Sequence, residues 1–166
     1  MLKIALVNDN DEIIGYSDKA EVHKKGILHR AFSILIYNSN GEMLIHRRAE
    51  GKYHSGGLWT NACCSHQYKG MDIYESAHLR LFEEMALKAD LEYKFKFRYY
   101  IEFENNMKEN EIDYVFVGYC DDTPTPIAEE VAECCWINPD ILKQDIKNHP
   151  EKYTFWFKRI LEELEG

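Results

Sequence analysis

The sequence predicts an α/β sandwich with a central mixed sheet. Strand-like segments lie on both sides of one internal helical segment, and an amphipathic helical segment ends the chain. The chain has 166 residues, of which 45% are hydrophobic and 13% aromatic, a composition typical of a globular protein. No repeat, low-complexity tract or linker divides it, so we expect residues 1–166 to form a single domain.

Strand patterns dominate the first part of the chain. Residues 3–16, KIALVNDNDEIIGY, predict two short strands around a polar turn. Residues 29–48 predict a β-hairpin, because two apolar runs flank an Asn-Gly pair, which tight hairpin turns prefer. Residues 57–67, GLWTNACCSHQ, have an extended pattern after a glycine-containing turn.

A change of period marks an internal helix between Met71 and Leu87. Asp72 is suited to cap its first turn, because an aspartate side chain accepts hydrogen bonds from the free amides there. The apolar face that we expect from helical spacing consists of Ile73, Ala77, Leu79, Leu81, Phe82 and Met85.

Strand patterns return in the second half of the chain. They lie near residues 93–103, 111–120 and 131–137, and residues 121–126 predict a proline-containing turn between the last two. From Pro150 to the end, the sequence predicts an amphipathic helix.

Charge and cysteine content argue against several classes of protein. A net charge of −9 without a basic run does not suit a general nucleic-acid partner or an anionic membrane, whereas a small anion needs only a few converging cations. The apolar runs are too short to cross a bilayer, and the N-terminal residues do not resemble a signal peptide. Four of the five cysteines form adjacent pairs, a poor disulfide framework, so we expect a reducing, cytoplasmic location.

Histidine and glutamate residues form a first candidate site. Glu109 and Glu111 point to the same face if their segment is a strand, because side chains alternate along a strand. With three imidazoles they make a mixed nitrogen and oxygen donor set that suits a divalent first-row metal. A single histidine is more often an ordinary polar residue, so the hypothesis depends on the ensemble of His23, His29, His66, Glu109 and Glu111.

Cations form a second candidate site. Arg80 and Glu84 share a helix face. They form either a surface ion pair or a functional pair in which Arg80 contacts a phosphate and Glu84 binds Mg²⁺. Lys19, Arg48 and Lys52 are either solvated charges or partners of a diphosphate, whose oxygens arginine can bind with two parallel hydrogen bonds.

Taken together, these segments resemble the type I isopentenyl-diphosphate isomerases, which are built on the Nudix fold. The resemblance extends from about Lys19 to Trp156, and its most specific segments are RRAEGKYHSGGLWTNACCSH at residues 47–66 and ENEIDYVF at residues 109–116. It implies a Nudix-type α/β/α sandwich and an enzyme that interconverts isopentenyl and dimethylallyl diphosphate. The chain departs from the family pattern at Gln67, where proline is usual, and at Ala86, where Nudix proteins usually have glycine.

The resemblance also implies roles for individual residues. Cys64 corresponds to the catalytic thiol, and Glu111, supported by Tyr99, to the acid/base group on the other side of the substrate. The family's ligands for one divalent metal, Mn²⁺ or Zn²⁺, correspond to His23, His29, His66, Glu109 and Glu111. Its positions for the diphosphate and for Mg²⁺ correspond to Lys19, Arg48, Lys52, Arg80 and Glu84, and Trp156 corresponds to the aromatic that faces a cationic intermediate.

The proposed chemistry explains why such residue types are needed. Protonation of an unactivated alkene gives a tertiary carbocation, and loss of a proton two carbons away completes the shift, so two acid/base groups are required. A thiol is mostly protonated at neutral pH because its ordinary pKa is about 8.5. An aromatic in the terminal helix such as Trp156 is most often core, and its alternative role is to stabilise the cation.

Two other functions remain open from the sequence. The first is a Nudix hydrolase, whose helix carries an Arg-Glu-x-x-Glu-Glu box, whereas this chain has LRLFEE at residues 79–84 and lacks the first glutamate. The second is a non-catalytic domain stabilised by a structural metal, for which two glutamate ligands and a separate basic cluster are unusual.

Overall fold

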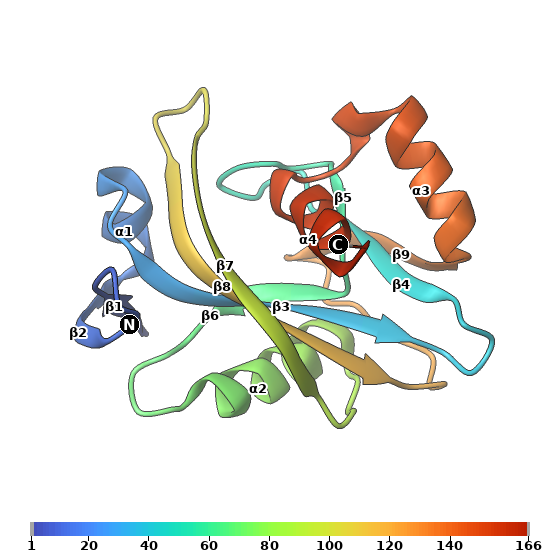
Figure 1. Cartoon of the computed structure of the whole chain (residues 1–166), viewed down its shortest axis with the longest axis horizontal. Helices are drawn as coiled ribbons and strands as arrows, with labels where there is room; N and C mark the ends of the chain where they lie inside the picture. The colour runs from blue at the N-terminus through green and yellow to red at the C-terminus, as the bar shows by residue number, and fades with distance from the viewer. Residues whose placement is uncertain (1, 166) are drawn as a thin grey trace.

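The computed structural model describes residues 2–165. Its strands are β1 (Lys3–Val7), β2 (Ile13–Asp18), β3 (His29–Tyr37), β4 (Met43–Arg48), β5 (Trp59–Thr60), β6 (Cys63–His66), β7 (Glu92–Glu102), β8 (Lys108–Tyr119) and β9 (Val131–Ile137). Its helices are α1 (Lys19–Lys25), α2 (Ile73–Met85), α3 (Pro139–Asn148) and α4 (Phe155–Glu165), with a 3₁₀ turn at Pro150–Lys152. α2 lies on one side of the sheet, and α3 and α4 lie on the other (Figure 1).

The sheet is mixed, and β3 is its central strand. β3 pairs in parallel with β8 over its whole length and antiparallel with β6, and β7 extends the sheet beyond β8. β4 pairs with β5 and β9 on the other side of the molecule. These layers confirm the predicted α/β/α sandwich with a central mixed sheet.

Two apolar clusters hold the layers together. Phe32, Ile34 and Phe116 pack against Leu81 and the other buried residues of α2 on one face of the sheet. The opposite faces of β3 and β8 pack against α3 and α4 through Leu142, Trp156, Phe157 and Ile160. A strand whose two faces are both covered is apolar along its length, as the AFSILI run in β3 shows.

The predicted hairpin of residues 29–48 forms only in part. The turn is present, with Gly41 at a positive φ of 75°, but β3 and β4 pair only at Tyr37 and Met43. The two strands then diverge, because β6 and β8 occupy the two edges of β3.

The internal helix was predicted at nearly its observed position. Asp72 caps α2 by accepting a hydrogen bond from the Glu75 amide at 2.8 Å. The expected apolar face was wrong at Leu79 and Phe82, which are 36% and 49% exposed. Neither lies on the side of the helix defined by Ala77, Leu81 and Met85.

Two helices lay outside the sequence prediction, and the last helix begins later than expected. α1 has an N-cap at Asp18 and a left-handed C-cap at Gly26, whose φ is 71°. α3 follows the N-cap Asn138 and has Pro139 in its first turn. The segment expected to be helical from Pro150 makes a 3₁₀ turn before α4 begins at Phe155.

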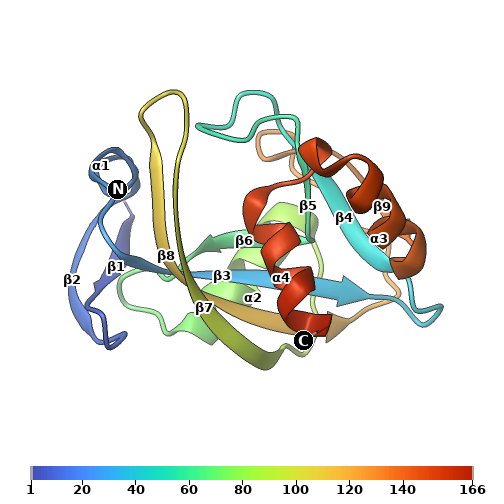
Figure 2. The same ribbon diagram turned by 45° about the horizontal axis from the view of Figure 1, so that its top comes forward.

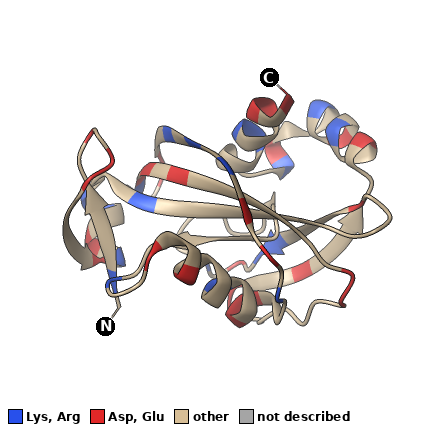
Figure 3. Cartoon of the chain, turned by 60° about the horizontal axis from the view of Figure 1, so that its bottom comes forward, with Lys and Arg blue, Asp and Glu red and all other residues tan. Residues whose placement is uncertain are grey.

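Lys and Arg positions are interspersed with Asp and Glu positions over the ribbon in this view (Figure 3). No helix within residues 2–165 is both long and apolar enough to span a membrane.

Candidate active site and metal centre

The register of three neighbouring strands gathers the polar side chains on one face of the sheet. His29 on β3 lies opposite Glu111 on β8, and Ser33 on β3 lies opposite Cys64 on β6. Residues two positions apart on a strand share a face, so the neighbours of Cys64 on β6 and of Glu111 on β8 at that spacing point to the same side. The face therefore carries His29, Ser33, Cys64, His66, Glu109, Glu111 and Asp113.

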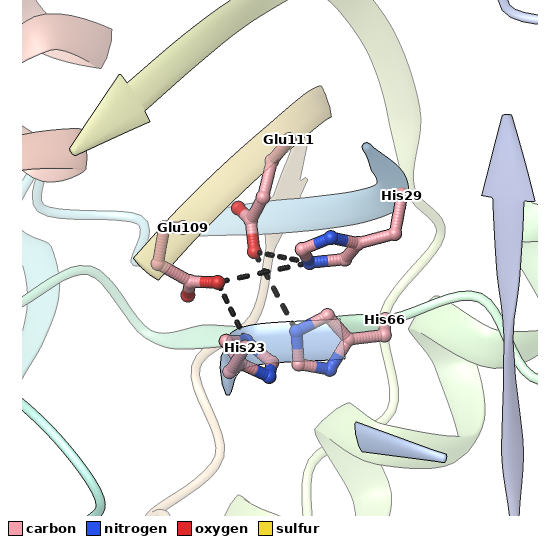
Figure 4. A group of neighbouring side chains, drawn as sticks. All are labelled: His23, His29, His66, Glu109 and Glu111. Carbon is pink, nitrogen blue, oxygen red and sulfur yellow. Dashed lines mark hydrogen bonds and ion pairs between the residues drawn. The ribbon is translucent and has the colours of Figure 1, made fainter. Parts of the chain in front are cut away.

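Five buried side chains converge at one end of this face (Figure 4). His23, from α1, places Nε2 2.5 Å from Oε1 of Glu109. His29 and His66 place Nε2 3.1 Å and 3.5 Å from Oε2 of Glu111. One potential ligand atom from each of the five residues lies within 4.8 Å of all the others.

The tautomers of two of these histidines orient lone pairs toward the carboxylates. Nδ1 of His23 lies 2.7 Å from the Lys19 carbonyl, and Nδ1 of His29 lies 2.9 Å from the Ile27 carbonyl. A carbonyl only accepts, so each Nδ1 carries the proton, and a neutral ring then presents a lone pair at Nε2. Burial lowers the pKa of His23, which favours the neutral ring.

A divalent cation fits this arrangement. Oε1 of Glu109 is buried and has no hydrogen-bond partner among residues 2–165, although it faces the imidazoles of His23 and His29. Lone pairs and a buried carboxylate that face one another repel, and a metal ion between them satisfies both. Three imidazoles and two carboxylates are suitable ligands for Mn²⁺ or Zn²⁺.

Next to this cluster is a cavity of about 210 Å³. Four cations line it, namely Lys19, Arg48, Lys52 and Arg80, together with Cys64, Trp156, Glu84 and Glu111. Nε of Arg48 and Nε of Arg80 are buried and have no hydrogen-bond partner within residues 2–165. Unpartnered buried donors of this kind fit an anion with several acceptor oxygens.

Short-range structure explains how two of these groups reach the site. Lys19 and His23 lie four residues apart on α1, so one helix face directs one to the cavity and the other to the metal cluster. Burial, with the neighbouring charges of Lys52 and Arg48, lowers the pKa of Lys19 to about 8.

Glu84 lies in the wall of the cavity, outside the five-residue cluster. Its Oε2 accepts a hydrogen bond from Arg80 at 2.8 Å, and burial raises its pKa. Glu83, the next residue on α2, has a side chain that is 46% exposed and contacts Arg80 from the solvent side. Only one carboxylate of the pair therefore faces the cavity.

The two adjacent cysteines face opposite sides of β6. Cys63 is fully buried in the cluster that packs against α2. Sγ of Cys64 accepts a hydrogen bond from Nε1 of Trp156 at 3.1 Å and lies 3.0 Å from Oδ1 of Asn61, which accepts the thiol proton. Burial and the charge of Asp113 raise the pKa of Cys64 to about 12, so it is a thiol at neutral pH.

Tyr99 and Trp156 also contact the site. The Tyr99 hydroxyl donates to Oε1 of Glu111 at 2.6 Å. Burial favours protonation of Glu111, but its contacts with the imidazoles of His29 and His66 outweigh this effect and hold its pKa well below the ordinary value. Trp156 is 3% exposed, and the guanidinium of Arg48 lies 5.2 Å from the centre of its ring.

The structure adds polar residues that the sequence analysis did not select. Asp113 follows Glu111 by two positions, so the same alternation that selects Glu109 and Glu111 could have found it. Asn61 lies between β5 and β6 and His54 lies in the loop between β4 and β5, and no local pattern indicates their roles. Asn61 is fully buried, and its Nδ2 donates to the carbonyls of Ile34 and Cys63, both at 3.0 Å.

Comparison with known proteins identifies the family of the chain. The family described as NUDIX domain matches residues 27–157. Isopentenyl-diphosphate Delta-isomerase 2 of Photorhabdus laumondii is 43% identical over 161 residues, which cover 97% of this chain and 91% of the relative. The chain belongs to the isopentenyl-diphosphate isomerase family.

A second relative agrees with this assignment, and two solved structures support the fold. The isopentenyl-diphosphate isomerase of Pectobacterium atrosepticum is 40% identical over 95% of this chain and 88% of its own. Among solved structures, a Deinococcus radiodurans protein has a TM-score of 0.70 and covers 89% of this chain and 90% of its own, at 18% identity. The MutT protein of Methanosarcina mazei has a TM-score of 0.66, covers 83% of this chain and 93% of its own, and is also 18% identical. These structures support the Nudix fold.

Proposed function

We propose that this chain interconverts isopentenyl diphosphate and dimethylallyl diphosphate. The observation that carries the proposal is that a protonated thiol and a carboxylate share one small cavity with four cations. The names of the relatives that are 40% and 43% identical support the same activity.

The cations bind the diphosphate end of the substrate. Lys19, Arg48 and Arg80 offer charge and buried donors without partners, which phosphate oxygens would satisfy. Lys52 is held in place by an ion pair with Glu130. We propose that Mg²⁺ binds beside Glu84 and offsets the charge of the diphosphate, since this ion is usually shared between one or two carboxylates and substrate phosphates.

The resting protonation states support one direction for the proton transfers. The thiol of Cys64 gives its proton to the terminal methylene carbon, and the alkene electron pair forms the new C–H bond, which leaves a tertiary carbocation. The carboxylate of Glu111 then takes a proton from the carbon on the other side of the cationic centre, and the electron pair of that C–H bond forms the new double bond. The reverse reaction exchanges these roles.

Neighbouring residues hold these two groups and protect the cation. Asn61 and Trp156 fix the Cys64 sulfur from two sides, and Tyr99 fixes Glu111. The Trp156 ring lines the cavity and offers a π face to the cation, and bound substrate would displace the water that could capture it.

A second divalent ion, Mn²⁺ or Zn²⁺, would be held by the cluster of His23, His29, His66, Glu109 and Glu111. When bound, this ion supplies positive charge that keeps Glu111 ionised in a buried site. The five free cysteines support a reducing, cytoplasmic location.

The geometry disfavours hydrolysis of a nucleotide. A cavity of about 210 Å³ is below the usual range for drug-sized ligands, so it suits a short isoprenoid chain better than a nucleoside. Glu84 is the only carboxylate of the LRLFEE segment that faces the cavity, whereas hydrolysis by this fold uses several.

One assay tests the proposal against its alternatives. The purified chain, supplied with divalent metals, is incubated with isopentenyl diphosphate in deuterated water, and both the dimethylallyl product and free phosphate are followed by NMR. We expect product that carries deuterium and no phosphate release. Phosphate release without product would indicate a hydrolase, and the absence of both would indicate a binding domain.

A further inference from the structure

A further imidazole, that of His54, contacts the metal cluster. His54 lies in the loop between β4 and β5, which runs beside the turn between β7 and β8 (Figures 1 and 2). Its side chain is 1% exposed, and its Nε2 lies 3.0 Å from Oε2 of Glu109. This is the second oxygen of the carboxylate whose Oε1 faces His23.

The hydrogen bonds of His54 differ from those of His23 and His29. Nδ1 of each of those two residues faces a carbonyl, which requires a proton on Nδ1. Nδ1 of His54 lies 3.0 Å from the hydroxyl of Ser55, which is able to donate. The proton of His54 is therefore free to reside on Nε2, where it satisfies the Glu109 carboxylate.

The surroundings hold His54 in this orientation. Its ring stacks on Phe103 with 4.1 Å between centroids and an angle of 7° between planes. The side chain of Asn105 donates to the Tyr53 carbonyl at 2.6 Å, which ties the loop to the β7–β8 turn. Ser55 has a positive φ of 54°, a backbone state that is costly for a residue other than glycine.

We propose that His54 is a positioning residue for the metal centre. By donating to Oε2 of Glu109, it turns Oε1 toward His23 and His29 and leaves that oxygen without a competing hydrogen bond. Groups that orient a ligating carboxylate in this way typically change metal affinity 10-fold to 100-fold when they are removed. This inference rests on the proposed function, because it takes the five-residue cluster to be the metal site.

Two substitutions at the same position separate this role from packing. His54→Phe keeps the flat ring that stacks on Phe103 but removes the donor. His54→Gln loses the aromatic ring but places an amide N–H near the position of Nε2. A positioning role predicts that Gln is the better replacement, and a packing role predicts that Phe is.

The measurement is the affinity of the full chain, first stripped of metal, for Zn²⁺ and for Mn²⁺ in competition with a chelator of known affinity. We expect His54→Phe to bind each ion about 10-fold to 100-fold more weakly than wild type, and His54→Gln to stay within about threefold. The thermal midpoint of each stripped protein serves as the control for folding.

The reverse order of affinities, or wild-type affinity in His54→Phe, would overturn the proposal. If His54→Phe does not fold, weak binding by a folded His54→Gln overturns it on its own. A wild-type chain that isomerises its substrate while both variants bind metal equally well would remove the role of His54 and leave the proposed function intact. A wild-type chain that binds neither ion would overturn both the metal centre and this inference.

Discussion

Lys19 gives the sharpest test of the proposed diphosphate site, because its amino group loses its positive charge within a pH range that an assay can cover. Burial and the neighbouring cations Lys52 and Arg48 lower its pKa to about 8, and its amino group lies 4.2 Å from the centre of the Tyr53 ring. A bound diphosphate would favour the protonated form. Substrate affinity is therefore full below about pH 8 and falls as pH rises through that value.

The size of the effect follows from this pKa. One pH unit above a pKa, about a tenth of the groups remain protonated, so kcat/KM at about pH 9 should be about tenfold below its value at pH 7. The thiol of Cys64, with a pKa of about 12, stays protonated over this range and does not add to the decline. The terminal phosphate, whose last pKa is about 6 in a phosphate ester, is mostly ionised over this range and does not add to the decline.

The matched control is Lys19→Arg, because arginine keeps its charge over the whole range. We expect this variant to have a different absolute KM but a nearly flat profile of kcat/KM between about pH 7 and pH 9. The assay measures initial rates of isomerisation at each pH for both proteins. Parallel declines in the wild type and in Lys19→Arg would show that another group titrates and would refute the reasoning.

Five further substitutions test other parts of the site and the fold. Cys64→Ala should nearly abolish isomerisation, whereas Cys63→Ala, on the opposite face of β6, should keep it; equal losses in two folded variants would contradict the assignment. Glu111→Gln should weaken metal binding and turnover together, and wild-type turnover in a direct assay would exclude both roles. Trp156→Phe should slow turnover several-fold to about tenfold with little change in substrate affinity, since a desolvated cation–π contact is worth about 2 kcal/mol. A lower thermal midpoint with unchanged turnover would show that Trp156 contributes only to packing. Ala86→Gly should raise the free energy of unfolding by about 1 kcal/mol, because Ala86 caps α2 with a φ of 55°; a lower denaturation midpoint would count against this account.

Sequence periodicity predicted those parts of the site that depend on alternation within one strand. Glu109 and Glu111 share a face as expected, and Cys63 and Cys64 are separated for the same reason. Asp72 predicted the start of α2, because capping is a local interaction between residues three positions apart.

The remaining features depend on contacts that a local pattern does not contain. The short helix α1 lacks a full apolar period, so its role in placing Lys19 and His23 was not visible. The pairing of β3 with β8 joins segments far apart in the chain, and this pairing decides that His29 meets Glu111. His54 reaches the centre from an irregular loop, where neither helical nor strand spacing applies.

The long separation between β3 and β8 also has a consequence for the order in which the protein folds. His29 and Glu111 are 82 residues apart in the sequence. The segments that form α2 and β7 must therefore be synthesised before β3 and β8 can pair. Contacts between distant segments form slowly, because the loop between them loses entropy before the contact is gained. A growing chain that ends before Glu109 has only the imidazole ligands of the cluster and lacks both carboxylates. If the cluster holds a metal as proposed, tight capture of that ion requires a chain that has completed β8, and the bound ion would then stabilise the pairing of the most distant strands.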